Sequence, residues 1–203
     1  MKKKIFTGLM ALAFVAPAMA ENRGDLLIRV RAIQLETADK SDANATAGLA
    51  ADAITVESKL IPEIDFTYFF TGNIAAELVL TYPQKHDVKL NGSTIGTFKH
   101  LPPTLTLQYH FNPAGTLRPY VGAGVNYTRI SSVHLAGGAI DLERSSVGLA
   151  VQAGFDYGLS KNLSLNVDVK KLRLGADVKV GGTTVSEVHL DPWLFGLGLG
   201  KKF

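Results

Sequence analysis

The stretch VGLAVQAGFDY, residues 147–157, alternates between apolar residues and small or polar ones. Every odd-numbered position in it is apolar, whereas the even-numbered positions include Gln152, Gly154 and Asp156. Successive side chains of a β-strand point to opposite faces, so this period of two predicts a strand with one apolar face.

The same pattern recurs along the chain, in segments about as long as the roughly 9–11 residues of a tilted membrane strand, with extensions. Tight turns near 71–72, 112–116 and 158–161 alternate with long loops at 37–57, 83–98, 131–144 and 173–186. This alternation of short turns and long loops is typical of outer-membrane barrels. We therefore predict an all-β fold, a transmembrane eight-stranded antiparallel up-and-down β-barrel. Its strands are expected at about 25–36, 58–70, 73–82, 99–111, 118–130, 145–157, 162–172 and 187–203.

Alternation alone also fits a soluble, lipocalin-like barrel, whose apolar face points inward. Three features favour the membrane barrel. Aromatic residues gather near strand ends on the apolar face, as in interfacial girdles. Phe203 stands in the last strand, where we expect an assembly signal for outer-membrane proteins. The polar face is rich in glycine, which suits a crowded lumen: Gly122, Gly124, Gly148, Gly154, Gly196, Gly198 and Gly200.

Residues 1–20 have the features of a secretory signal peptide. Lys2–Lys4 form a positive region, residues 5–15 form an apolar core, and Ala18-Met19-Ala20 is a small-x-small cleavage site. The apolar run is shorter than the roughly 20 residues that a spanning helix needs. We expect cleavage to leave a barrel domain of residues 21–203 in the outer membrane of a Gram-negative bacterium.

Charge and composition exclude several function classes. The chain has 21 basic and 18 acidic residues, but three of the lysines lie in the signal peptide, so the mature chain carries no net charge. Bulk charge therefore gives no reason to expect nucleic-acid binding. The chain has no cysteine, which excludes disulfides and thiolate metal sites. No two histidines have ligand spacing, and no helix follows the glycines at 196–200, so we predict no metal and no cofactor.

Three strings carry a family resemblance: HLPPTL at 100–105, RPYVGAGVNYT at 118–128 and LDPW at 190–193. Together they resemble the OmpW family of outer-membrane proteins, over the whole mature chain. The resemblance implies a narrow eight-stranded barrel with a hydrophobic channel, which passes small apolar molecules and opens sideways through the wall. Lys170 and Lys171 stand near a position where family aromatics are expected, which puts a gate at the seventh strand in doubt.

Charged residues on the predicted lumen face suggest a polar plug. An eight-stranded barrel is just wide enough to be filled by side chains, and buried charges there should pair. These pairs either seal the lumen or merely fill the core. The residues concerned are Arg29, Glu63, Asp65, Glu77, His110, Arg118, Asp156, Asp168 and Lys202.

Above the plug, on the side of the long loops, we expect an apolar funnel of Leu60, Val79, Leu101 and Leu172. Proline cannot donate to a strand ladder, so interruptions near prolines either open the wall or are ordinary bulges. The prolines concerned are Pro62, Pro102 and Pro103.

Passive uptake of small hydrophobic molecules, with lateral release into the bilayer, is the function that these features favour. The expected partners are outer-membrane lipid, lipopolysaccharide, the barrel assembly machinery and the solutes themselves. A structural or receptor barrel that binds phage, bacteriocin or host surfaces is the alternative. A rim-site enzyme is disfavoured, because the histidines near the predicted loops show no Ser-His-Asp or G-x-S-x-G pattern. These histidines are His86, His100, His134 and His189.

Overall fold

The computed structural model describes residues 20–203, except 38–39, 45–49 and 57. Of the predicted signal peptide, residues 1–19 lie outside the described residues, so its cleavage stays a prediction. Within the described part of the chain, no helix is long and apolar enough to span a membrane.

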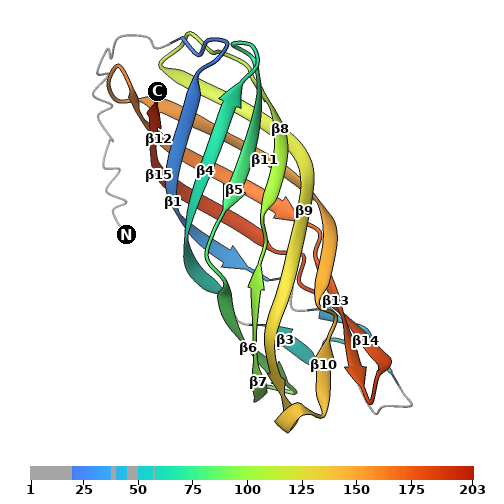
Figure 1. The fold of residues 1–203 in the computed structure, drawn as a ribbon. Coiled ribbons are helices and arrows are strands. Elements are labelled where there is room, and N and C mark those ends of the chain that lie inside the picture. The colour runs from blue at the N-terminus through green and yellow to red at the C-terminus, as the bar shows by residue number, and fades with distance from the viewer. Residues whose placement is uncertain (1–19, 38–39, 45–49, 57) are drawn as a thin grey trace, which may run out of the picture.

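Eight antiparallel strands close into a barrel, which confirms the predicted fold (Figure 1). The order β1–β4–β5–β8–β9–β11–β12–β15 returns to β1, because β15 pairs with β1 from Lys202 opposite Leu27 to Trp193 opposite Glu36. The bounds are β1 (Leu26–Glu36), β4 (Lys59–Phe69), β5 (Ile74–Leu80), β8 (Thr104–His110), β9 (Leu117–Leu135), β11 (Ser145–Gly158), β12 (Leu163–Leu172) and β15 (Trp193–Lys202).

The segments predicted as long loops are corrected by the structure, because much of their length forms further strands beyond one end of the barrel (Figure 1). Tight turns explain two of the hairpins: Asn91-Gly92 and Gly181-Gly182 all have positive φ, as two-residue hairpin turns require. The additional elements are β2 (Lys40–Ser41), β3 (Ile54–Val56), β6 (Gln84–Leu90), β7 (Ser93–Leu101), η1 (Ala136–Gly138), β10 (Ile140–Leu142), β13 (Gly175–Val180) and β14 (Thr183–His189). We call this part the extracellular extension, because we expect the long-loop end of the barrel to face outside the cell.

The apolar face of the barrel strands points outward, as predicted. Val30, Leu107 and Val147 are 59%, 59% and 75% exposed, whereas charged residues on the opposite face are buried. A band of exposed apolar side chains of this kind fits lipid rather than water. At the end of the barrel opposite the extension, the exposed Phe203 donates its backbone N–H to the carbonyl oxygen of Leu26.

Glycine on the inner face makes room for large polar side chains. A Cβ atom at Gly154 would lie 2.6 Å from Tyr120 Oη and 2.5 Å from the carbonyl oxygen of Val167. We predict that Gly154→Ala lowers the free energy of unfolding by about 1–3 kcal/mol, the usual cost of overpacking. Urea unfolding in lipid vesicles measures the difference. Gly158→Ala is the matched control, because its Cβ would meet no atom closer than 3.4 Å; equal losses in both variants would contradict the prediction.

Candidate functional site

Arg29 of β1 lies at the centre of a buried charge network inside the barrel. Its Nε and Nη2 donate to the two carboxylate oxygens of Asp156 at 3.0 and 2.7 Å. Its Nη1 donates to Asp65 Oδ1 at 2.9 Å and to Thr67 Oγ1 at 2.7 Å. All four side chains are buried. Bidentate hydrogen bonds of this kind hold a guanidinium in one fixed orientation.

A second tier lies toward the extracellular extension, around Arg31. Its Nη2 is 2.7 Å from Glu63 Oε1, 2.9 Å from Asp65 Oδ2 and 2.9 Å from Glu77 Oε1. Lys170 Nζ of β12 lies 3.7 Å from the other carboxylate oxygen of Glu77. The two tiers share Asp65, so the charges form one continuous network across the lumen.

Tyr120 of β9 closes the network on its other side. Its hydroxyl donates to Asp168 Oδ2 at 2.8 Å, and the guanidinium carbon of Arg29 lies 5.3 Å from its ring centroid. Asp168 is also 3.8 Å from Arg31. The strand pattern alone places Tyr120 on the inner face, but only the packing shows that its hydroxyl belongs with the charges.

The structure brings most of the predicted plug residues together and adds two that the prediction missed. Arg31 follows the predicted member Arg29 by two residues, and Lys170 follows Asp168 by two. Residues two apart in a strand share a face, so strand parity places both on the inner face. The predicted plug residues that join the network are Arg29, Glu63, Asp65, Glu77, Asp156 and Asp168.

The other three predicted plug residues lie nearer the short turns, outside the central network. Glu21 Oε1 accepts from Arg118 Nε at 2.9 Å, and its Oε2 lies 3.0 Å from His110 Nδ1. Lys202 Nζ pairs with Asp25 at 2.9 Å and is partly exposed at the rim. His110 and Arg118 therefore form a cluster with Glu21 that adjoins the network on its short-turn side, where His110 stacks on the Tyr120 ring at 5.1 Å. Lys202 lies apart from both, at the rim.

Ligand-type atoms of Glu21, His110 and Asp156 lie within 4.8 Å of one another. Arg118 and Arg29 already hold the two carboxylates, at 2.9 and 2.7 Å. Two guanidinium groups beside the cluster repel a metal cation, so this arrangement favours a structural role for the three residues.

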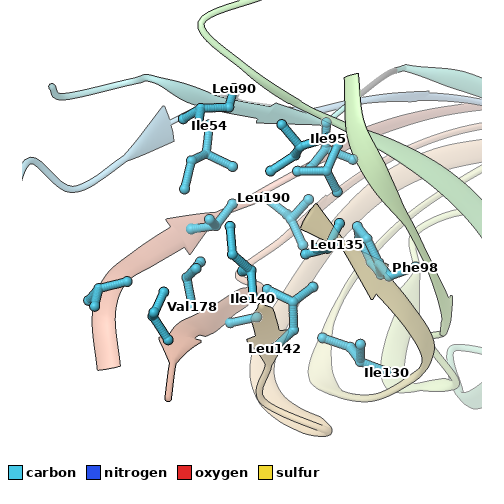
Figure 2. Close-up of a pocket in the computed structure, with 16 residues that line it drawn as sticks. Ile54, Leu90, Ile95, Phe98, Ile130, Leu135, Ile140, Leu142, Val178 and Leu190 are labelled. Carbon is cyan, nitrogen blue, oxygen red and sulfur yellow. The ribbon is translucent and has the colours of Figure 1, made fainter. Parts of the chain in front are cut away.

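The extracellular extension encloses an apolar cavity of about 240 Å³ (Figure 2). Its walls come from β3, β6, β7, β9, β10, β13 and β14, and all of the lining side chains are apolar. Figure 2 shows Phe98, Leu135 and Leu142 among the side chains that surround it. The full lining is Ile54, Val56, Val88, Leu90, Ile95, Phe98, Ile130, Leu135, Ile140, Leu142, Ala176, Val178, Val180, Val185, Val188 and Leu190.

The predicted funnel residues do not line this cavity. Leu60 is 65% exposed on the lipid face, because the β1–β4 ladder runs in register through Gln34 opposite Leu60 and no bulge reverses its direction. Leu101 is half-buried and lines neither this cavity nor the one below it. Val79 and Leu172 face inward but line a smaller cavity of about 20 Å³, between the network and the extension. Most of the apolar lining lies in segments that were predicted as long loops, whereas Ile130, Val188 and Leu190 belong to predicted strands.

The predicted prolines do mark interruptions of the ladder. Pro62 pairs with Ala32 in the β1–β4 ladder. Toward β5, it lies before the start of the ladder, and its carbonyl oxygen accepts from the side-chain hydroxyl of Thr81. The β5–β8 ladder begins at Thr104, just after Pro102 and Pro103. On the side that faces β9 the wall stays closed, because the backbone N–H of Tyr127 donates to the carbonyl oxygen of Pro103 at 3.0 Å.

A larger groove, of about 650 Å³, lies elsewhere in the wall. It forms at the end of β11 nearest the extension, where Ser145–Leu149 separate from β12 and face β13. Charged side chains and one histidine line much of it: Glu143, Arg173, Asp177, Glu187, His189 and Asp191.

His86 and His100, which the sequence places near predicted loops, are buried in the extension. Their ring centroids lie 4.6 Å apart, and His86 also stacks on Phe98 at 5.7 Å. Burial, together with the neighbouring His86 and Lys59, lowers the pKa of His100 to about 3. His100 is therefore uncharged at neutral pH.

A closed barrel with lipid-facing apolar side chains and a buried charge network defines an outer-membrane β-barrel protein. The OmpW family model matches residues 22–203, and the chain belongs to the OmpW family.

Relatives and solved structures agree with this assignment. An uncharacterized outer-membrane protein, y4mB, from Sinorhizobium fredii is 41% identical, with 93% of this chain and 86% of the relative covered. Outer membrane protein W from Vibrio cholerae is 34% identical, with 99% and 100% covered. The crystal structure of the outer membrane protein OprG from Pseudomonas aeruginosa is similar with a TM-score of 0.80 and 29% identity, over 93% of this chain and 99% of that one. The protein therefore resides in the outer membrane of a Gram-negative bacterium.

Proposed function

We propose that the protein takes up small hydrophobic molecules from outside the cell and passes them into the outer membrane. The observation that carries this proposal is the wholly apolar cavity of about 240 Å³ above the charge network. An apolar solute that enters it gains roughly 25 cal/mol for each Å² removed from water. Every lining side chain in the described part of the chain is a hydrocarbon, so the cavity selects by apolar surface.

The charge network supports lateral release rather than passage straight through the barrel. Arg29 and Arg31 are held by carboxylates on several strands, and a solute would have to separate these buried pairs to pass. Breaking such pairs is strongly unfavourable. The solute leaves sideways instead, near the interrupted ladder at Pro62 and Pro102. The groove beside β13 is less suitable because polar and charged side chains make up most of its lining, with Val147, Leu149, Leu174 and Ala176 as the apolar ones.

The remaining partners follow from this location. The lipid-facing strands contact outer-membrane lipid, and the extension meets the lipopolysaccharide of the outer leaflet. Phe203 is exposed directly after β15, next to the first residue of β1, and serves as the signal for the barrel assembly machinery.

Uptake of octane by Gram-negative cells tests the proposal. We expect cells with the protein to take up octane several-fold faster than cells without it. The double variant Pro102→Val and Pro103→Val should lose most of this increase, because valine restores the donors that close the ladder. Pro119→Val, in the β9 ladder opposite Phe155, is the matched control and should keep it.

Two results would count against the proposal. Equal octane uptake with and without the protein would reject transport. Uptake that depends on the protein but is unchanged in the folded double variant would reject the exit at Pro102 and leave transport standing.

A further inference from the structure

We infer that, among small hydrophobic molecules, the protein favours those with one uncharged oxygen at one end, such as the hydroxyl of a primary alkanol, and that His100 and Lys170 bind this oxygen. This inference rests on the proposed function and names the solute class. It starts from the small cavity of about 20 Å³ between the charge network and the apolar cavity. A space of this size holds about one water-sized group.

Two buried polar groups line this small cavity without a hydrogen bond. Lys170 is 2% exposed, and its Nζ has an ion pair with Glu77 at 3.7 Å but no hydrogen-bond partner among the described residues. His100 is 4% exposed, and its Nδ1 likewise has no hydrogen-bond partner there. Leaving buried donors and acceptors unpaired is unfavourable, so a ligand oxygen between them stabilises both.

The position of the small cavity fits the polar end of an apolar molecule. His100 follows Phe98 by two residues on the same face of β7, and their ring centroids lie 6.2 Å apart. Phe98 lines the apolar cavity, whereas His100 lines the small one. A hydrocarbon chain in the apolar cavity can therefore direct its end past Phe98 toward His100, with its remaining length among apolar side chains.

Charge determines which oxygen is favoured. The network around Lys170 contains three cations, Arg29, Arg31 and Lys170, but five acidic residues: Glu63, Asp65, Glu77, Asp156 and Asp168. A carboxylate ligand would add another negative charge beside Glu63, which lines the same small cavity. Like charges in a buried site repel strongly. A hydroxyl avoids this repulsion, because it accepts from Lys170 while it donates to a neighbouring acceptor.

The test compares initial uptake rates of 1-octanol, octane and octanoate in cells with and without the protein. We expect the protein-dependent rate for 1-octanol to exceed that for octanoate. The variants His100→Phe, which keeps the ring stack, and Lys170→Met should each lower the octanol-to-octane ratio about tenfold while octane uptake stays within about twofold. Thr81→Val is the matched control: Thr81 lines the same cavity, but its hydroxyl already bonds to Pro62.

A second measurement reads the contact directly. In protein with ¹⁵N-labelled histidine in lipid nanodiscs, 1-octanol should shift the Nδ1 resonance of His100, whereas octane should not. An unchanged ratio in folded His100→Phe, or no shift with 1-octanol, overturns the inference and leaves hydrocarbon uptake intact. Absence of octane uptake by the unaltered protein instead rejects the proposed function, whatever the resonance does.

Discussion

Arg29→Ala is expected to lower the free energy of unfolding by about 3–5 kcal/mol, the range found when one partner of a buried ion pair is removed. The substitution leaves Asp156 and Asp65 buried without the guanidinium that now contacts them at 2.7 and 2.9 Å. The Thr67 hydroxyl loses its donor as well. Urea unfolding in lipid vesicles, followed by the change in gel mobility between folded and unfolded barrel, measures the loss.

Val30→Ala is the control for this experiment, because Val30 is the next residue on the same strand and is 59% exposed to lipid. Its truncation removes no ion pair, so we expect a change within about 1 kcal/mol. If Arg29→Ala and Val30→Ala lowered the free energy of unfolding equally, the network would be filler whose charges contribute nothing specific to the barrel.

Ala176→Trp is expected to reduce octane uptake by about tenfold. Ala176 is 4% exposed and lines the apolar cavity of about 240 Å³, so an indole there occupies space that the solute needs. A solute that loses about 60 Å² of apolar burial loses ~1.5 kcal/mol of binding free energy, which corresponds to about tenfold in affinity. The initial rate of octane uptake by cells that carry the variant measures the effect.

The matched control is Ala123→Trp, which introduces the same indole on the lipid face of β9, where Ala123 is exposed. It should leave octane uptake unchanged, because it lies outside the barrel. The amount of folded protein in the membrane must be equal for both variants. Full uptake by folded Ala176→Trp would show that the solute does not pass through this cavity.

The barrel could be predicted from the sequence because its strands obey a local rule. Each strand is half in lipid and half in a crowded lumen, so the period of two appears directly in stretches such as residues 147–157. The same parity places Arg29, Asp65 and Asp156 inside, as found. It also holds for Leu60, which faces outward and not into the predicted funnel.

The cavity could not be predicted because its walls lie in segments without a lipid-facing side. Residues 174–180 do alternate between apolar and polar or small positions, but this pattern does not show what the apolar side packs against. The hairpins in 83–98 and 173–186 depend on the turns Asn91-Gly92 and Gly181-Gly182. These hairpins enclose a cavity only when β7 pairs with the end of β9 and β13 pairs with β10. The apolar lining thus comes from segments far apart in the chain, whose meeting no local pattern records.

By itself, the sequence determined the closed eight-stranded barrel, the direction of its apolar face and the presence of paired charges in its lumen. Those properties follow from residue spacing within single strands, which the chain carries locally. Only the tertiary structure decided which charges touch, that Arg31 and Lys170 join them, and where the apolar cavity lies. These properties depend on register between strands and on side-chain packing across the lumen, which are set by contacts between residues distant in sequence.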